Sequence, residues 1–166
     1  MLACVDVHYT PRTAAAGCVL FHEWTDDAPA RELVHIGSAP ANYRPGEFYR
    51  RELPSVLAVL RKINVLPTLV IVDGYVWLGG GKKGLGAHLA RELPGPAIVG
   101  VAKTEFRGAP AAPVLRGRSR RPLFVTTAGI DLHRAAAQLR AMHGPHRIPT
   151  LLKRVDRLCR SAATDS

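Results

Sequence analysis

Two aspartates stand where carboxylates are costly. Asp6 interrupts the apolar run of residues 2–7, and Asp73 ends the apolar run of residues 69–73; both runs are rich in β-branched side chains. Such runs predict short buried strands, where a charge is strongly unfavourable unless a partner compensates it. A third acid, Glu52, opens a predicted helix between them. Acids on separate elements that must be compensated together indicate a shared divalent cation.

Each acid also has an ordinary structural interpretation. Backbone amides alone could hold Asp6, and a strand could simply end in a turn at Asp73 and Gly74. An acid such as Glu52 near a helix N-terminus is favourable electrostatics. The functional interpretation rests on their combination, because ligands bind at the carboxyl ends of strands in open α/β sheets.

The bulk composition limits the classes of protein. The chain has 166 residues, of which 47% are hydrophobic, so it suits one domain with a real core and not a disordered tail. The formal net charge of +10 favours a polyanion, DNA or RNA, as partner. The alternative is that the arginines reflect composition alone.

The cysteines and the first residues bear on location. Cys4, Cys18 and Cys159 are far apart and form no CxxC pair, so a zinc ribbon and a secreted disulfide scaffold are both disfavoured. Residues 1–6 read as a strand without a basic region, so we expect no signal peptide. No apolar stretch is long enough to cross a bilayer. We therefore expect a cytoplasmic protein without a membrane partner.

The predicted elements indicate the fold. Strands are expected at residues 2–9, 14–24, 31–37, 68–73, 97–102 and 122–127, and helices at 49–63, 85–92, 131–142 and 149–160. Three consecutive strands predict an antiparallel meander, and the alternation after it predicts α/β crossovers. The fold class is therefore α/β, with a ribonuclease H-like mixed sheet flanked by helices. We expect a single domain over 1–160 and a frayed tail over 161–166.

Basic side chains gather near the predicted strand ends. Lys103 ends a strand, where a cation can hold the scissile phosphate, although it could equally be a solvated lysine. The run 116–121 is expected to be exposed and to contact phosphates through Arg118 and Arg120, or only to aid solubility. His88 is expected to lie near the site.

The glycine-rich loop 79–84 has a misleading pattern. It satisfies GxGxxG between a strand and a helix, but it starts too far from the strand end for a dinucleotide turn, and it fails the P-loop pattern. We therefore expect no nicotinamide or ATP cofactor. A loop that binds a nucleic-acid backbone is the better interpretation, with Lys82 and Lys83 as phosphate contacts.

Together these motifs resemble the endonuclease V family. The matching segments, in family order and near-family spacing, are 5–7, 43–46 through 51–54, 72–74 through 84–89, 99–103, and 147–149 through 156. They cover most of the chain.

The resemblance implies a site. Asp6, Glu52 and Asp73 would hold Mg²⁺, with Mn²⁺ as a possible substitute; Asp156 matches a later acid near that cluster, and Lys103 the lysine at the scissile phosphate. Tyr43 matches the wedge beside the modified base, and Gly74, Gly84 and Gly86 the floor of the hypoxanthine pocket. The residues expected to contact nucleic acid are Tyr43, Arg44, Gly74, Lys82, Lys83, Gly84, Gly86, His88, Arg118 and Arg120.

Two departures from the family pattern leave alternatives open. Residues 79–82 replace the usual His-Pro-Arg-Arg, and residues 127–129 replace Gly-His-Arg. The preferred hypothesis is a metal-dependent endonuclease that cuts phosphodiester bonds near inosine in DNA or RNA. The second is a degenerate relative that binds nucleic acid without cutting it, and a weaker third is a dinucleotide-dependent enzyme.

Overall fold

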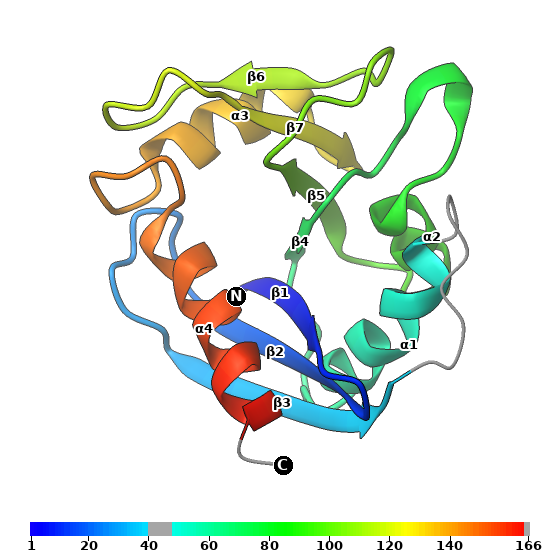
Figure 1. Ribbon diagram of the computed structural model, residues 1–166. Coiled ribbons are helices and arrows are strands. Elements are labelled where there is room, and N and C mark those ends of the chain that lie inside the picture. The colour runs from blue at the N-terminus through cyan, green and yellow to red at the C-terminus, as the bar shows by residue number, and fades with distance from the viewer. Residues whose placement is uncertain (40–47, 165–166) are drawn as a thin grey trace.

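The computed structural model describes residues 1–39 and 48–164, and within them seven strands form one mixed sheet (Figure 1). The strands are β1 (Leu2–Tyr9), β2 (Thr13–Phe21), β3 (Arg31–Ser38), β4 (Leu69–Asp73), β5 (Ala97–Ala102), β6 (Ala112–Val114) and β7 (Leu123–Ala128). The helices are α1 (Phe48–Leu60), α2 (Leu85–Glu92), α3 (Leu132–Ala141) and α4 (Thr150–Thr164), with a 3-10 turn, η1, at Gly79–Gly81. The predicted α/β class is confirmed.

The strand order brings three parallel strands to the centre of the sheet. The order is β3-β2-β1-β4-β5-β7-β6. β1, β2 and β3 form the predicted antiparallel meander, whereas β4 and β5 run parallel to β1 and to each other. The C-terminal ends of β1, β4 and β5 therefore meet at one edge of the sheet.

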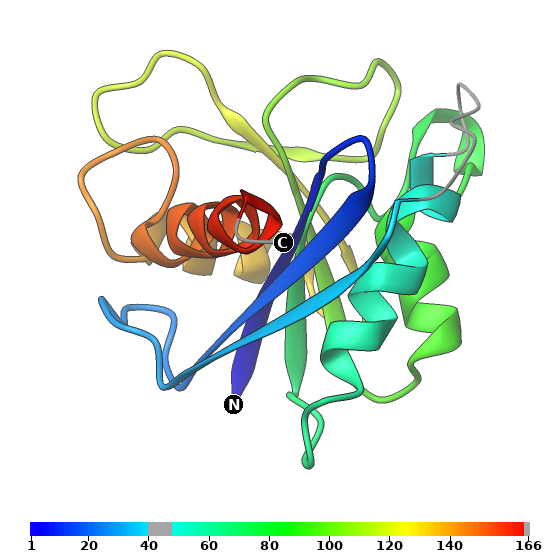
Figure 2. The same ribbon diagram turned by 60° about the horizontal axis from the view of Figure 1, so that its bottom comes forward.

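Helices cover both faces of the sheet (Figure 2). α1 and α2 pack on the face that carries Val5 and Val72, and α3 and α4 pack on the face that carries Cys4 and Ile71. Side chains alternate between the faces of a strand. Asp73 therefore follows Ile71 onto the α4 face, and Asp6 follows Cys4 onto that face, opposite Val5.

The second strand is shorter than the predicted range 14–24. β2 ends at Phe21 because the Asp26 carboxylate closes a turn there. It accepts hydrogen bonds from the backbone amides of His22 at 2.9 Å and Glu23 at 3.0 Å. A local side-chain acceptor of this kind competes with strand pairing.

Two further elements differ from the expected ranges. The last helix runs to Thr164, beyond residue 160, because its apolar stripe continues. That stripe is buried at every fourth residue: Leu151, Val155, Cys159 and Ala163. Residues 104–121, where no strand was expected, contain β6, an edge strand paired with β7. Among the described helices, none is both long and apolar enough for a bilayer crossing.

Candidate active site

Asp6 and Asp73 lie side by side at the C-terminal edge of the sheet. The parallel register pairs Val5 with Val72, so the aspartates occupy the next position on adjacent strands. Asp6 Oδ1 accepts a hydrogen bond of 2.8 Å from the Val7 amide. Burial, and then the charge of Asp73, raise the pKa of Asp6 to about 7. One amide donor does not offset the loss of hydration and the neighbouring acid.

Glu52 reaches the same edge from α1 and is only 7% exposed. The guanidinium of its neighbour Arg51 lies over the Tyr9 ring, 3.9 Å from its centroid. Within the described part of the chain, no hydrogen bond or ion pair to the Glu52 carboxylate is present. Burial, and then the charges of Asp6 and Asp73, raise the pKa of Glu52 to about 9. A buried acid with no hydrogen-bond or ion-pair partner among the described residues is the least expected group in this core.

Lys103 directly follows β5 and points back to the acids. Its Nζ lies 2.6 Å from Asp73 Oδ2. Partial burial opposes the charge of the Lys103 amine, but the hydrogen bond and the charge of Asp73 outweigh burial and raise its pKa. The Lys103 carbonyl accepts from the Arg147 guanidinium, which also donates to the Pro122 carbonyl at 2.8 Å. Arg147 thus fixes the backbone from which Lys103 extends, a role that its place in the matching segment 147–149 does not by itself reveal.

α4 brings Asp156 to the acids. Its two carboxylate oxygens accept hydrogen bonds of 3.0 and 3.1 Å from Arg160 Nε. The charge of Asp156 also contributes to the raised pKa of Asp6. The spacing of four residues on a helix is the sequence signal that reveals Arg160 as its partner.

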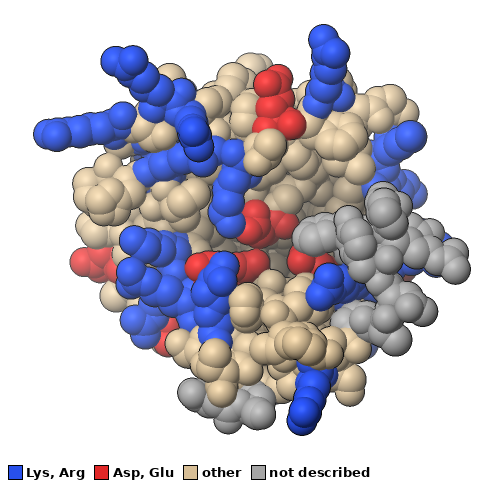
Figure 3. All heavy atoms as spheres, in the orientation of Figure 1, with Lys and Arg blue, Asp and Glu red and all other residues tan. Residues whose placement is uncertain are grey.

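Two cavities share one boundary. Both are bounded by Asp6, Asp73, Lys103, Asp156 and Arg160, which we call the shared row. The loop-side cavity, about 440 Å³, lies between the shared row, α1 and the loop after β4. Its other lining residues are Val7, His8, Tyr49, Glu52, Gly74, Tyr75, Leu78, Lys83, Gly84, Leu85, Ala102 and Thr104. The helix-side cavity, about 380 Å³, lies between the sheet and α4. Figure 3 shows acidic atoms inside a hollow on this face, with lysine and arginine side chains around it.

The wall of the loop-side cavity is a tightly folded backbone. The amide of Gly84 donates to the Val76 carbonyl at 2.8 Å, and a Cβ on Gly84 would lie 2.3 Å from the Tyr75 oxygen. The Val76 amide donates to Thr126 Oγ1 at 2.8 Å. Gly86, expected in a pocket floor, packs against Val76 in the core and lines neither cavity.

Few of the residues expected to contact nucleic acid face the cavities. Tyr43 and Arg44 lie outside the described residues. Gly74, Lys83 and Gly84 line the loop-side cavity. The other three cations, Lys82, Arg118 and Arg120, are exposed and line neither cavity.

His88 lies behind the loop-side cavity. Its ring stacks on Tyr49, with the ring centroids 3.6 Å apart and the planes 8° from parallel. Burial, and then the charge of Arg91, lower the pKa of His88. His88 therefore supports the wall formed by Tyr49 and does not face the shared row.

Arg116 corrects the expectation that the whole run 116–121 is exposed. It is 5% exposed. Its guanidinium donates to carbonyls that follow or end α3: Arg140, Met142, Gly144, His146 and Arg147. Helix C-termini leave such carbonyls without partners. One arginine therefore organises the segment that carries Arg147, and nothing in the sequence separates it from its neighbours.

The donor set suits a hard divalent cation in type and charge. Its members are carboxylates, the ligands that Mg²⁺ and Mn²⁺ prefer. Among the described residues, no three His, Cys, Asp or Glu side chains lie close enough to hold one ion as they stand. Lys103 and Arg160 already neutralise two of the acids. The raised pKa values of Asp6 and Glu52 show that their negative charge is unfavourable in this site, and a bound cation would stabilise that charge.

Fold and site together define a class. The protein is an α/β protein with a ribonuclease H-like mixed sheet and carboxylates at the ends of its central strands. The family model of Endonuclease V matches residues 1–140. An Endonuclease V from Streptomyces avermitilis is 34% identical over 185 aligned residues, which span 98% of this chain and 80% of the relative. The chain belongs to the Endonuclease V family, a family of endonucleases.

Solved structures agree with this assignment. The crystal structure of the Streptomyces avermitilis Endonuclease V has a TM-score of 0.76 and 31% identity, and the match covers 99% of this chain and 81% of that one. Endonuclease V from Ciona intestinalis, in complex with a 24mer DNA containing an inosine followed by a ribo-adenosine, has a TM-score of 0.83 at 17% identity, covering 99% and 86%. At that identity the likeness shows the fold alone.

Proposed function

We propose that this protein is a divalent-metal-dependent endonuclease that hydrolyses a phosphodiester bond near inosine in DNA or RNA. Family membership supports the nuclease activity, and the inosine-containing DNA bound by the Ciona intestinalis relative supports the deaminated base. The observation that carries the metal is the pair of buried acids, Asp6 and Glu52, whose pKa values are raised beside Asp73.

The residues divide the work as follows. Asp6, Glu52 and Asp73 would hold the ion, and Asp156 lies at the edge of the group. When bound, Mg²⁺ or Mn²⁺ would supply Lewis-acid stabilisation and lower the pKa of a bound water.

Lys103 is the cation that faces the phosphate. Asp73 is now paired with the Lys103 amine, which would be placed to bind a phosphate oxygen if a cation took over that carboxylate. The oxygen of water forms a bond to phosphorus while the bond from phosphorus to the 3′ oxygen breaks. The products are a 5′-phosphate and a 3′-hydroxyl, which takes up the proton.

The test is cleavage of end-labelled oligonucleotides. Matched DNA and RNA strands with and without one inosine are incubated with Mg²⁺, Mn²⁺ or EDTA. We expect metal-dependent cutting of the inosine strands, loss of cutting in Asp73→Asn, and normal cutting in the control Asp27→Asn, which changes an exposed acid. Absence of metal-dependent cutting of every inosine-containing, abasic and unmodified strand would refute the proposal.

A binding protein without nuclease activity is the second candidate. Asp73 forms an ion pair with Lys103, and Asp156 forms one with Arg160. These two acids therefore need no cation to compensate their charge, which favours the second candidate. It predicts full affinity for the oligonucleotides in EDTA and no product with any metal. Cleavage by the wild type that Asp73→Asn abolishes would eliminate it.

A further inference from the structure

The apolar part of the helix-side cavity, beyond the shared row, has no role in the function proposed above. The cavity lies across the shared row from the loop-side cavity, and its floor is aliphatic. Sheet and helix both contribute to that floor: Ile71, Val101 and Leu123 from the sheet, and Leu152 and Val155 from α4. Its volume of about 380 Å³ falls in the range of roughly 300–1,000 Å³ typical of small-molecule sites.

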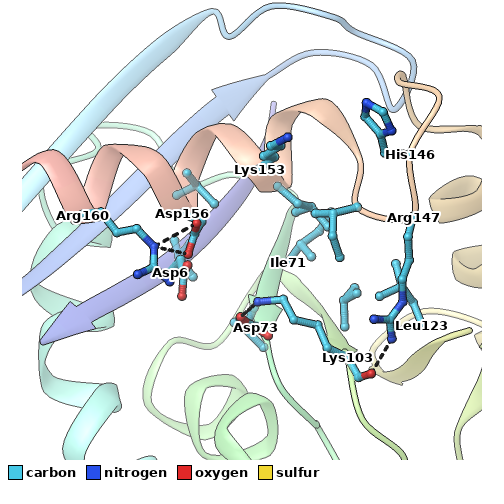
Figure 4. A pocket seen from close by; sticks show the side chains of 16 residues that line it. Asp6, Ile71, Asp73, Lys103, Leu123, His146, Arg147, Lys153, Asp156 and Arg160 are labelled. Atoms are coloured by element: carbon cyan, nitrogen blue, oxygen red, sulfur yellow. Dashed lines mark hydrogen bonds and ion pairs between the residues drawn. The ribbon is translucent and has the colours of Figure 1, made fainter. Parts of the chain in front are cut away.

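The mouth of this cavity is basic. His146, Arg147 and Lys153 line it on the side away from the acids, and Lys103 and Arg160 line it within the shared row. Figure 4 shows Ile71 between Lys103 on one side and Lys153 on the other. The Arg147 guanidinium is held in place at this cavity by the carbonyls of Lys103 and Pro122, to which it donates. An apolar body that carries negative charge at its edge fits this chemistry.

We propose that the helix-side cavity is a second nucleotide subsite of the same strand. The inference rests on the proposed function, in which the scissile phosphate lies at the shared row. A strand that crosses the row with one nucleotide in the loop-side cavity places another nucleotide on the opposite side. There the base or sugar meets the aliphatic floor, and the next phosphate meets Lys153 and His146.

The chemistry of the floor sets the kind of selectivity. Aliphatic side chains offer no donors or acceptors to base edges, so the subsite accepts any base. It distinguishes a strand that has a base at this position from a strand that lacks one. This is selection by apolar contact and charge, as in other single-strand binding grooves.

The test uses a cavity-filling change and an abasic scan. Leu152→Trp fills the cavity, and Leu158→Trp makes the same change elsewhere on α4, at a residue that lines neither cavity. A fluorescein-labelled, inosine-containing single-stranded DNA is prepared in versions that each lack one base. Affinities are measured by fluorescence anisotropy in EDTA, so the readout is independent of cutting.

We expect one abasic position to weaken binding by the wild type and by Leu158→Trp about tenfold, the order expected when an apolar base face stays in water. Leu152→Trp should bind the complete strand about tenfold more weakly and show no further loss at that position. Circular dichroism checks folding, and the smaller Leu152→Phe replaces Leu152→Trp if the latter unfolds.

Equal affinities of Leu152→Trp and Leu158→Trp, or an abasic effect that persists in Leu152→Trp, would overturn the subsite. A protein or lipid occupant of the cavity would give that same equality. Cleavage is scored separately. A wild type that cuts without this base dependence refutes only the subsite, and a wild type that shows the base dependence without cutting refutes only the nuclease.

Discussion

Replacing Glu52 by glutamine should stabilise the metal-free protein while removing a carboxylate from the proposed ion site. Glutamine keeps the shape of the side chain and has no proton to lose. In the wild type the unfolded chain releases the Glu52 proton near pH 4.5, whereas the folded protein keeps it to about pH 9. Between these values the folded state binds more protons, so its stability falls as pH rises.

The magnitude follows from that interval. At pH 7.5 the solution is roughly three pH units above the pKa of Glu52 in the unfolded chain. Each unit lowers the free energy of unfolding of the wild type by about 1.4 kcal/mol, so its total loss of stability is at most about 4 kcal/mol. Burial of an unpartnered amide offsets about 1–2 kcal/mol of the gain. We therefore expect Glu52→Gln to be ~2 kcal/mol more stable at pH 7.5 in EDTA, a rise of roughly 4–8 °C in Tm.

The assay is thermal and urea unfolding in EDTA from pH 4 to 8.5, with Glu23→Gln, a change of an exposed acid, as control. The advantage of Glu52→Gln should be absent at pH 4.5, where only the cost of the buried amide remains, and should grow as the pH rises. Mg²⁺ at 100 times its Kd should then stabilise the wild type by about 2.7 kcal/mol and the variant much less. A variant that melts no higher than wild type at pH 8, or an advantage that does not change with pH, would show that Glu52 is compensated in some other way.

Three further predictions concern the basic residues. Lys103→Met should lower kcat by roughly 100-fold, the order expected for loss of a group that stabilises transition-state charge. The Kd measured by anisotropy in EDTA should change less than about threefold. A kcat within about threefold of wild type would contradict the role of Lys103 at the phosphate. Arg116→Met should lower the free energy of unfolding measured in urea by ~3 kcal/mol, because several buried carbonyls lose their donor. The control Arg118→Met, at an exposed residue, should change it by less than about 0.5 kcal/mol. Equal losses in the two variants would refute the organising role of Arg116. The double change Arg118→Ser with Arg120→Ser should reduce the slope of log Kd against the logarithm of the salt concentration by roughly 1–2 if both arginines contact phosphate. An unchanged slope would show that these arginines serve solubility and do not contact phosphate.

The fold was predictable where the sequence pattern and the packing agree. β1 and β4 are apolar on both faces, so the two aspartates stand out, and alternation alone places Asp6 opposite Val5. Boundaries set by side chains were not predictable in this way. The turn that ends β2 depends on Asp26 accepting two amides, which is one of several local options for such a residue.

The site was predictable in its acids and less so in its basic groups. Charge in an apolar strand is rare, so it carries information. An arginine in a basic run carries little, since only the tertiary fold decides that Arg116 enters the interior while Arg118 stays outside. Gly86 shows the same limit, because a close approach to Val76 in the core explains that glycine as well as a pocket floor does.

Under the proposed function, the segment after β4 would link base recognition to cutting through its own backbone. Asp73 and Tyr75 are separated by one glycine. The Val76 amide after Tyr75 donates to Thr126 Oγ1, and the Tyr75 carbonyl accepts from the Gly86 amide at 3.1 Å. Because this segment is short and fixed at both ends, a base that fitted badly against Tyr75 in the loop-side cavity would also displace the Asp73 carboxylate. Selection of the correct base would then need no moving lid, because a wrong base would displace Asp73 and so prevent cutting.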